Sequence, residues 1–177
     1  MKTGQVQVYT GNGKGKTTAA LGLCVRALGA GLSVYIGQFI KGMRYAEIVT
    51  LEQLSALLGK DKLEVEQYGR GCFIFRDPAP EDVEAAARGL DRAVEILRSG
   101  TRELVVLDEI NVACHYGLVP EERLPELLDA RPEGVELVLT GRYAPDLLLQ
   151  RGDLVTEMKE IKHYYHKGLQ ARDGIER

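Results

Sequence analysis

The chain has 177 residues, 45% of them hydrophobic and 28% charged, which is the balance of a globular protein long enough to bury a core. Its formal net charge of −3 is not that of a typical binder of duplex nucleic acid, which carries a basic surface. It shows no targeting segment, no stretch long enough to cross a bilayer and no C-x-x-C pair among its three cysteines. We therefore expect a cytoplasmic protein with no nucleic-acid partner and no membrane partner.

Short β-branched runs alternate with helical stretches along the chain. In chain order, the pattern predicts strands at residues 5–10, 33–39, 63–68, 104–107, 135–140 and 154–158. Between them it predicts helices at residues 16–29, 46–58, 81–98, 120–130 and 144–151. Residues 69–80 are rich in glycine and proline and are predicted as a loop. The polar tail from about 159 to 177 has no clear period.

The longest predicted helix and the most apolar predicted strand indicate how the chain packs. The helix at 81–98 has one apolar face, made by Val83, Ala87, Leu90, Val94 and Leu97. The run 104–107 is apolar throughout, which suits a parallel sheet buried on both sides. We predict one domain over residues 1–177, an α/β fold with a doubly wound, mostly parallel sheet and helices on both faces. In such sheets, ligands bind at the carboxyl ends of the strands.

The segment TGNGKGKTT at residues 10–18 follows the first predicted strand and opens the first predicted helix. Its glycines let backbone N–H groups turn toward phosphate oxygens, and the helix N-terminus adds partial positive charge. Lys16 can reach the phosphates, and the Thr17 hydroxyl can ligate Mg²⁺. The loop departs from the strict pattern, because Thr10 stands where glycine is usual and Lys14 adds a cation. In a P-loop NTPase-like fold, the predicted nucleotide-binding residues are Thr10, Gly11, Asn12, Gly13, Lys14, Gly15, Lys16, Thr17 and Thr18.

The run LVVLDE at residues 104–109 is an apolar strand that ends in two carboxylates. P-loop proteins use such a strand to handle Mg²⁺, with a carboxylate opposite the hydroxyl of the phosphate loop. Strand alternation places Asp108 and Glu109 on different sides, so only one of them need face the nucleotide. We predict a metal site formed by Thr17, Asp108 and Glu109. A solvated strand end is the alternative interpretation of the two acids.

Two further cations follow predicted strands at the same edge of the sheet. Lys41 in QFIKG could contact substrate or phosphate, although the residue taken alone favours a solvated loop lysine. Arg142 in TGR could hold a phosphate tail through two hydrogen bonds, or could be solvent-exposed. His163 and His166 lack a third ligand nearby, so hydrogen-bonded surface histidines are favoured over a metal site.

Several motifs occur together and in order along the chain. They are GNGKGKTT at 11–18, QFIKG at 38–42, VVLDE at 105–109, ARP at 130–132, TGR at 140–142 and KH at 162–163. This set resembles the P-loop ATP:corrinoid adenosyltransferases and spans nearly the whole chain. The resemblance implies transfer of the 5′-deoxyadenosyl group from ATP to the cobalt of cob(I)alamin or cob(I)yrinic acid a,c-diamide, in adenosylcobalamin biosynthesis or salvage. Triphosphate would leave intact.

The resemblance also implies how the charged residues work. Lys14, Lys16 and Arg142 would be the catalytic cations, which stabilise charge on the leaving triphosphate. Lys41 would lie near the nucleotide in the family's QFIKG element. Reduced cobalt is itself the nucleophile, so the enzyme positions two reactants and needs no acid–base set.

In the same family, Thr17 and Glu109 match the Mg²⁺ ligands, and Asp108 matches the other member of the acidic pair. The family enzymes are homodimers that receive an electron from a reduced flavin protein, so we expect the same partners here. ATP and the corrinoid would be the substrates, with Mg²⁺ as the metal.

The chain departs from the family pattern at two places. Some members have an N-terminal extension over the active site, whereas the first strand here begins close to Met1, so that cover is expected to be missing or supplied otherwise. Some members also have Gly-Phe-x-Trp in a loop that displaces the lower ligand of cobalt, where this chain has GCFIF at 71–75. Cys72, Phe73 and Phe75 are therefore the candidate corrinoid-binding residues, as a hydrophobic lid or as loop residues anchored on the domain.

Two other kinds of function are compatible with the same phosphate loop. A small-molecule kinase or ATPase would use the loop and the acidic strand equally well, and would form ADP and phosphate. A non-catalytic protein could instead use ATP to order a surface for a partner. The first alternative is disfavoured because no arginine-rich lid segment is visible.

Overall fold

The computed structural model describes residues 3–71 and 78–176, and its six strands form one parallel sheet. The order across the sheet is β3-β2-β4-β5-β1-β6. The strands are β1 (Val6–Thr10), β2 (Val34–Lys41), β3 (Leu63–Gly71), β4 (Leu104–Asp108), β5 (Glu136–Thr140) and β6 (Leu154–Glu157). The predicted α/β fold with a parallel sheet is confirmed.

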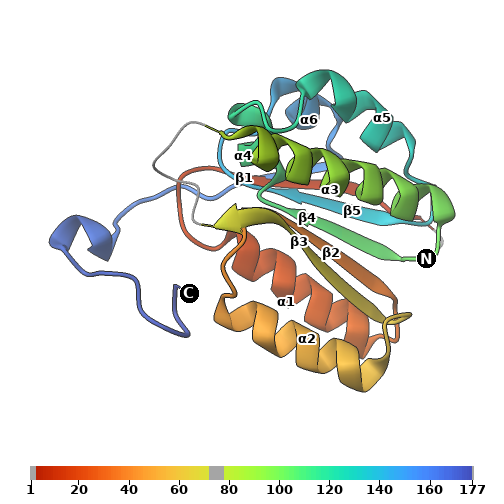
Figure 1. Cartoon of the computed structure of the whole chain (residues 1–177), viewed down its shortest axis with the longest axis horizontal. Helices are drawn as coiled ribbons and strands as arrows, with labels where there is room; N and C mark the ends of the chain where they lie inside the picture. The colour runs from red at the N-terminus through yellow and green to blue at the C-terminus, as the bar shows by residue number, and fades with distance from the viewer. Residues whose placement is uncertain (1–2, 72–77, 177) are drawn as a thin grey trace.

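Helices cover both faces of this sheet, as predicted (Figure 1). They are α1 (Lys16–Gly29), α2 (Ala46–Leu58), α3 (Pro80–Ser99), α4 (Ile110–His115), α5 (Leu124–Asp129) and α6 (Asp146–Arg151). From β1 to β3 the chain moves toward one edge of the sheet, and after β3 it moves back across it. Right-handed crossovers in opposite directions then place α1 and α2 on one face and the later helices on the other.

The sheet separates two buried apolar clusters, one under each helical layer. All five residues of β4 are buried. Val105 and Leu107 of this strand pack in the cluster below α3, whereas Leu104 and Val106 pack in the cluster below α1. This alternation follows from the period of two along a strand. The predicted burial of the run on both sides is confirmed.

Helix α3 buries a stripe that differs from the predicted one at its start. Val83 is 38% exposed, whereas Ala85, Ala86 and Gly89 are buried. A Cβ on Gly89 would stand 2.5 Å from Cγ of Tyr68, so the helix approaches β3 through its small residues. The prediction was wrong at Val83 because the periodic pattern favours large apolar side chains, whereas close packing here selects small ones.

The largest other differences from the sequence predictions are at β3, α4 and α5. β3 continues to Gly71, because its pairing with β2 extends to Lys41, so the first residues of the predicted loop 69–80 are strand. The helix α4 was not predicted, since its six residues are too few to show a helical period. The predicted helix 120–130 is a 3-10 turn at Glu121–Arg123 followed by α5.

After β6 the tail leaves the sheet and extends to one side, where it contains the short 3-10 helix η2 (Tyr164–Lys167) (Figure 1). The phosphate loop, the turn after β2, the start of α4 and this tail all lie at the carboxyl edge of the strands, where ligands bind in such sheets. Among the helices of residues 3–71 and 78–176, none is long and apolar enough to span a membrane.

Candidate active site at the phosphate loop

The loop between β1 and α1 has the backbone form that phosphate binding needs. Gly11 and Gly15 have φ angles of 93° and 121°, which glycine adopts without steric cost. The loop leads into the N-terminus of α1, where free N–H groups and the helix dipole favour an anion. Gly13 donates its N–H to the Met158 carbonyl at 2.6 Å. A Cβ on Gly13 would stand 2.7 Å from that oxygen, so the segment after β6 requires glycine there.

Lys16, the first residue of α1, is only 7% exposed. Its Nζ donates to the carbonyls of Gly11 at 2.6 Å and Gly13 at 2.8 Å. These bonds fold the side chain back over the loop, so the ammonium lies where the loop would hold phosphate oxygens. Burial lowers the pKa of Lys16, although the nearby Glu109 carboxylate favours its charged form.

Asp108, the last residue of β4, is 1% exposed and has a partner on both carboxylate oxygens. Its Oδ1 accepts hydrogen bonds from the hydroxyls of Thr17 at 2.8 Å and Thr140 at 2.7 Å. Its Oδ2 accepts from Gln38 at 3.0 Å and from the Lys41 ammonium at 3.1 Å. Burial disfavours the charged carboxylate, but the Lys41 charge and these hydrogen bonds outweigh it, so the pKa of Asp108 lies below its usual value.

Glu109 follows Asp108 but has left the strand, with a φ angle of 61° at the N-cap of α4. Its N–H donates to Thr140 Oγ1 at 3.0 Å. Burial and the neighbouring Asp108 charge raise the pKa of Glu109 above its usual value. Both carboxylates act on the Lys16 charge. Because β4 ends at Asp108, strand alternation does not apply at Glu109, and the expectation that the two acids lie on different sides stays a prediction.

The residues predicted to hold Mg²⁺ fit that ion in their chemistry. The Thr17 hydroxyl and the two carboxylates are hard oxygen donors, as Mg²⁺ prefers. The Lys41 ammonium, 3.3 Å from Thr17 Oγ1 and 3.1 Å from Asp108 Oδ2, is a cation held at these oxygens. In the described part of the chain, no group of three or more His, Cys, Asp or Glu side chains could hold a metal alone. In a nucleotide complex, phosphate oxygens and water would complete its coordination.

Lys14 contacts the C-terminal tail. Its Nζ donates to Tyr164 Oη at 3.1 Å and to the Ile175 carbonyl at 2.9 Å, and pairs with Glu176 at 3.0 Å. The Tyr164 hydroxyl also donates to Glu176, and Arg172 pairs with the same carboxylate at 3.1 Å. The hydrogen bonds that Lys14 donates to Tyr164 and Glu176 raise its pKa. If Lys14 binds phosphate as predicted, these contacts must open.

Other predicted residues lie around this centre. Arg142, in the turn after β5, is exposed, and its charge acts on both Lys16 and Glu109. Thr10 Oγ1 accepts the N–H of Ala144 at 3.3 Å, which ties the phosphate loop to that turn. The side chains of Asn12, on the loop, and of Thr18, in the first turn of α1, are exposed.

The candidate corrinoid-binding residues Cys72, Phe73 and Phe75 lie outside the described residues. The two histidines of the tail are described, and both are hydrogen-bonded. His166 Nε2 pairs with Glu160 at 2.6 Å, and His163 Nδ1 accepts the N–H of Tyr165 at 3.1 Å. The interpretation of these histidines as hydrogen-bonded side chains is confirmed.

Sequence reasoning did not single out Gln38 and Thr140, although both complete the Asp108 carboxylate. Their strands, β2 and β5, flank β4 on either side, and Gln38 is in register with Asp108. Both residues lie inside motifs that were recognised, QFIKG and TGR, and each is a buried polar residue near the end of an apolar strand. That pattern is the signal that could have found them.

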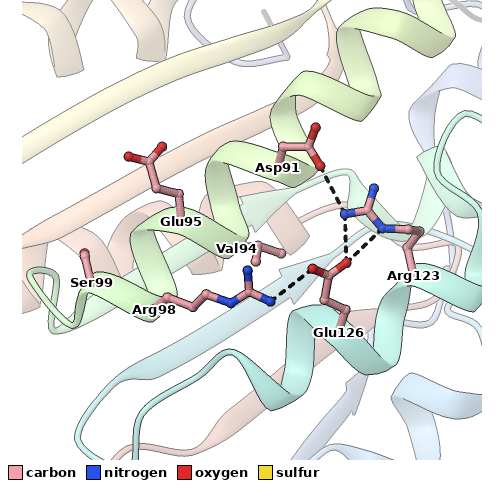
Figure 2. Close-up of a pocket in the computed structure, with 7 residues that line it drawn as sticks. All are labelled: Asp91, Val94, Glu95, Arg98, Ser99, Arg123 and Glu126. Carbon is pink, nitrogen blue, oxygen red and sulfur yellow. Dashed lines mark hydrogen bonds and ion pairs between the residues drawn. The ribbon is translucent and has the colours of Figure 1, made fainter.

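A separate hollow lies on the outer surface of α3 and α5, and Figure 2 shows its side chains. Its charges compensate each other, because Arg123 pairs with Asp91 at 3.0 Å and Arg98 pairs with Glu126 at 3.1 Å. α3 ends at Ser99, just before β4 begins, so this part of the helix lies near the amino edge of the sheet. The hollow is therefore distinct from the phosphate loop and has no free charge for an anion.

A strand, a glycine loop and a helix, with Lys16 over the loop and Thr17 bonded to the acid at the end of β4, define a P-loop nucleotide-binding protein. The family described as ATP:corrinoid adenosyltransferase BtuR/CobO/CobP matches residues 2–177. The chain belongs to this family and is therefore an enzyme that takes ATP and a corrinoid as substrates.

Similar proteins agree with this assignment. A corrinoid adenosyltransferase of Sinorhizobium sp is 34% identical over 175 residues, covering 98% of this chain and 80% of the relative. One of Pseudomonas aeruginosa is 34% identical over 173 residues, covering 98% and 83%. One of Escherichia coli (strain K12) is 32% identical over 173 residues, covering 98% and 85%. The resemblance expected from the motifs is confirmed.

Proposed function

We propose that the enzyme transfers the 5′-deoxyadenosyl group of ATP to the cobalt of cob(I)alamin or cob(I)yrinic acid a,c-diamide, in adenosylcobalamin biosynthesis or salvage. The cobalt(I) electron pair forms a bond to the 5′ carbon, and the bond from that carbon to its phosphate oxygen breaks. Triphosphate leaves with the bonding electrons. The observation that carries the proposal is the buried Lys16 ammonium over the glycine loop, next to the Thr17–Asp108 pair, in a chain matched by the family from residue 2 to 177.

The work of the protein is to stabilise the leaving triphosphate and to position it. Lys16 lies over the loop and would bind its oxygens as a fixed positive charge. The N-terminus of α1 adds its dipole on the same side. Arg142 is exposed nearby and would neutralise the outer end of the triphosphate, as would Lys14 once it leaves the tail. Such preorganised charges need no rearrangement as the leaving group develops negative charge.

Thr17, Asp108 and Glu109 would hold Mg²⁺ beside the phosphates. The ion would supply charge neutralisation on phosphate oxygens, which is its usual part in nucleotide chemistry. Asp108 keeps the Thr17 hydroxyl oriented through their 2.8 Å hydrogen bond. Its two other neutral partners, Gln38 and Thr140, fix the carboxylate itself.

Further features rest on the family resemblance. We propose a homodimer, a reduced flavin protein as the electron donor, a cytoplasmic location and one domain over residues 1–177. Cys72, Phe73 and Phe75 remain our candidates for contact with the corrinoid. Size-exclusion chromatography with light scattering tests the dimer, and cobalt reduction by a reduced flavodoxin tests the donor.

The proposal is tested by following the corrinoid spectrum without oxygen, in the presence of ATP, Mg²⁺ and chemically reduced cob(I)alamin. We expect the cob(I) band to disappear as a light-sensitive alkylated product forms, and we expect this to be about 100- to 1000-fold slower with Lys16→Ala. A repeat with cob(I)yrinic acid a,c-diamide covers substrate preference. Formation of ADP with both corrinoids unchanged would favour a small-molecule kinase or ATPase, and ATP binding without any product would favour a non-catalytic binding protein.

A further inference from the structure

The Lys41 ammonium lies between the oxygens that are predicted to ligate magnesium. Its Nζ is 3.1 Å from Asp108 Oδ2 and 3.3 Å from Thr17 Oγ1. The Lys41 side chain is 21% exposed and that of Asp108 is 2% exposed. Lys41 does more than neutralise Asp108, because its ammonium also contacts the Thr17 hydroxyl. The ammonium therefore has the same oxygen neighbours that a bound metal would have.

The local backbone holds Lys41 in this position at a steric cost. The pairing of β2 with β3 shifts register between Phe39 and Lys41, which is where a bulge re-aims a side chain. Ile40, between them, has a φ angle of 66°, which is strained for a β-branched residue. A Cβ on Gly69 would stand 2.1 Å from the Ile40 carbonyl oxygen, so the neighbouring strand must have glycine there. Strain of this kind is typical of functional sites.

An ammonium and a magnesium ion exclude each other at this place. Mg²⁺ binds its oxygens at about 2.0–2.1 Å, and a second cation beside the same oxygens would be strongly repelled. Lys41 also has a neighbour other than these oxygens, because its Nζ lies 5.7 Å from the centre of the Tyr45 ring. A nucleotide triphosphate would offer it new negative partners when the metal arrives.

We propose that Lys41 is an exchangeable internal cation that occupies the metal position of the nucleotide-free enzyme and moves onto the triphosphate when metal and ATP bind together. This rests on the proposed function only in placing the metal at Thr17 and Asp108. While the Lys41 ammonium pairs with Asp108, a divalent cation without nucleotide would have to bind a carboxylate whose charge is already neutralised. The site therefore discriminates against metal alone and accepts metal with nucleotide. Lys41 acts as a positioning residue for the acid and the hydroxyl.

The test is binding of Mn²⁺ in the absence of nucleotide and corrinoid, followed by the electron paramagnetic resonance signal of the free ion. We expect no measurable binding to the wild-type enzyme at millimolar Mn²⁺, and at least about tenfold tighter binding to Lys41→Met, because the acidic pair loses its cation. Lys41→Arg keeps a cation and should behave as the wild type does. Lys14→Met is the matched control, since it removes a loop cation that does not touch Asp108, and it should leave Mn²⁺ binding unchanged.

Two results would overturn the proposal. One is tight Mn²⁺ binding to the nucleotide-free wild type, which needs no variant and so is unaffected by folding defects. The other is equal Mn²⁺ binding by Lys41→Met and the wild type, with circular dichroism showing both folded. If Lys41→Met does not fold, Lys41→Gln takes its place, because its amide can still donate to Asp108. No corrinoid is present, so failure of adenosyl transfer and failure of this proposal are read separately.

Discussion

Lys16 and Lys14 stand two positions apart in the phosphate loop, yet Lys16 is 7% exposed and the Lys14 side chain is 41% exposed. Lys16 bonds to the carbonyls of its own loop, beside an acid that closes β4. Lys14 bonds to Tyr164, Ile175 and Glu176 of the tail, whose described residues include the short 3-10 helix η2. We call the side of the loop at Lys16 and Asp108 the inner side, and the side at Lys14 the outer side. The inner side is held by the sheet, whereas the outer side is held by the tail.

This difference indicates which part of the site is prebuilt and which part must change. Hydrogen bonds around Asp108 are shielded from water and come from the two neighbouring strands, β2 and β5, and from α1. Ion pairs around Glu176 face solvent, where salt screens them and each contributes little. We infer that the inner contacts serve the chemistry, whereas the outer contacts open when the triphosphate enters.

Lys16→Ala should cause the largest loss. It removes the buried cation that would face the leaving triphosphate, and removal of one such preorganised group costs about 100- to 1000-fold in rate. The measurement is kcat for corrinoid adenosylation at saturating ATP. Lys14→Ala is the control on the outer side, and we expect it to lose less than about tenfold. Equal losses for the two variants would contradict the distinction between the inner and outer sides.

Asp108→Ala should cause the largest loss of stability. It leaves the Lys41 ammonium without its carboxylate and leaves the Thr17 and Thr140 hydroxyls without their acceptor. Breaking a buried pair of this kind costs about 3 kcal/mol of unfolding free energy, the low end of the usual range, because Lys41 keeps some exposure. Urea unfolding measures it. Glu176→Ala should leave the unfolding midpoint close to that of the wild type, and a comparable shift there would argue against the contrast.

Glu109→Gln should increase stability at neutral pH while it impairs catalysis. Burial and Asp108 raise the pKa of Glu109, so the folded state binds more protons than the unfolded state above the unfolded pKa of about 4.3. Stability therefore falls as pH rises through the raised folded pKa, and the substitution removes this slope. Asp108 has the opposite sign, because its lowered pKa stabilises the fold above about pH 4 and that contribution is lost as pH falls. Unfolding midpoints between about pH 2 and pH 8 measure both slopes, and an unchanged slope in Glu109→Gln would count against the assigned shift.

Glu176→Gln should give the smallest effect. It weakens the contact between the tail and Lys14 without touching the inner side of the loop. Because the tail must release Lys14 before phosphate binds, ATP should bind roughly two- to fivefold more tightly, and the gain should shrink at high salt. Calorimetric titration with a non-hydrolysable ATP analogue at two salt concentrations measures it. Weaker binding by the variant would show that the tail assists the nucleotide.

The sequence predicted the inner side well, because its signals are local. The phosphate loop has a motif of contiguous residues, and the bounds of α1 and α2 agree with the predicted 16–29 and 46–58. The acid at the end of an apolar strand was also recognisable. In each case, spacing along the chain is enough to define the feature.

The parts that were missed depend on neighbours in space. Gln38 and Thr140 both contact Asp108 because β2 and β5 flank β4 in the sheet. The order of strands in a sheet cannot be predicted from the pattern of residues within one strand. Glu109 itself has a left-handed backbone conformation and lies outside the strand, which strand alternation does not predict. The tail has no period, so its contact with Lys14 could not be inferred from spacing.

The most direct test of the account is the identity of the phosphate product in a single anaerobic turnover with excess enzyme, followed by ³¹P nuclear magnetic resonance alongside the corrinoid spectrum. We expect one triphosphate for each alkylated cobalt, with both products forming about 100- to 1000-fold more slowly in Lys16→Ala. Formation of ADP or free phosphate at the rate of ATP loss, with the cobalt unalkylated, would contradict it.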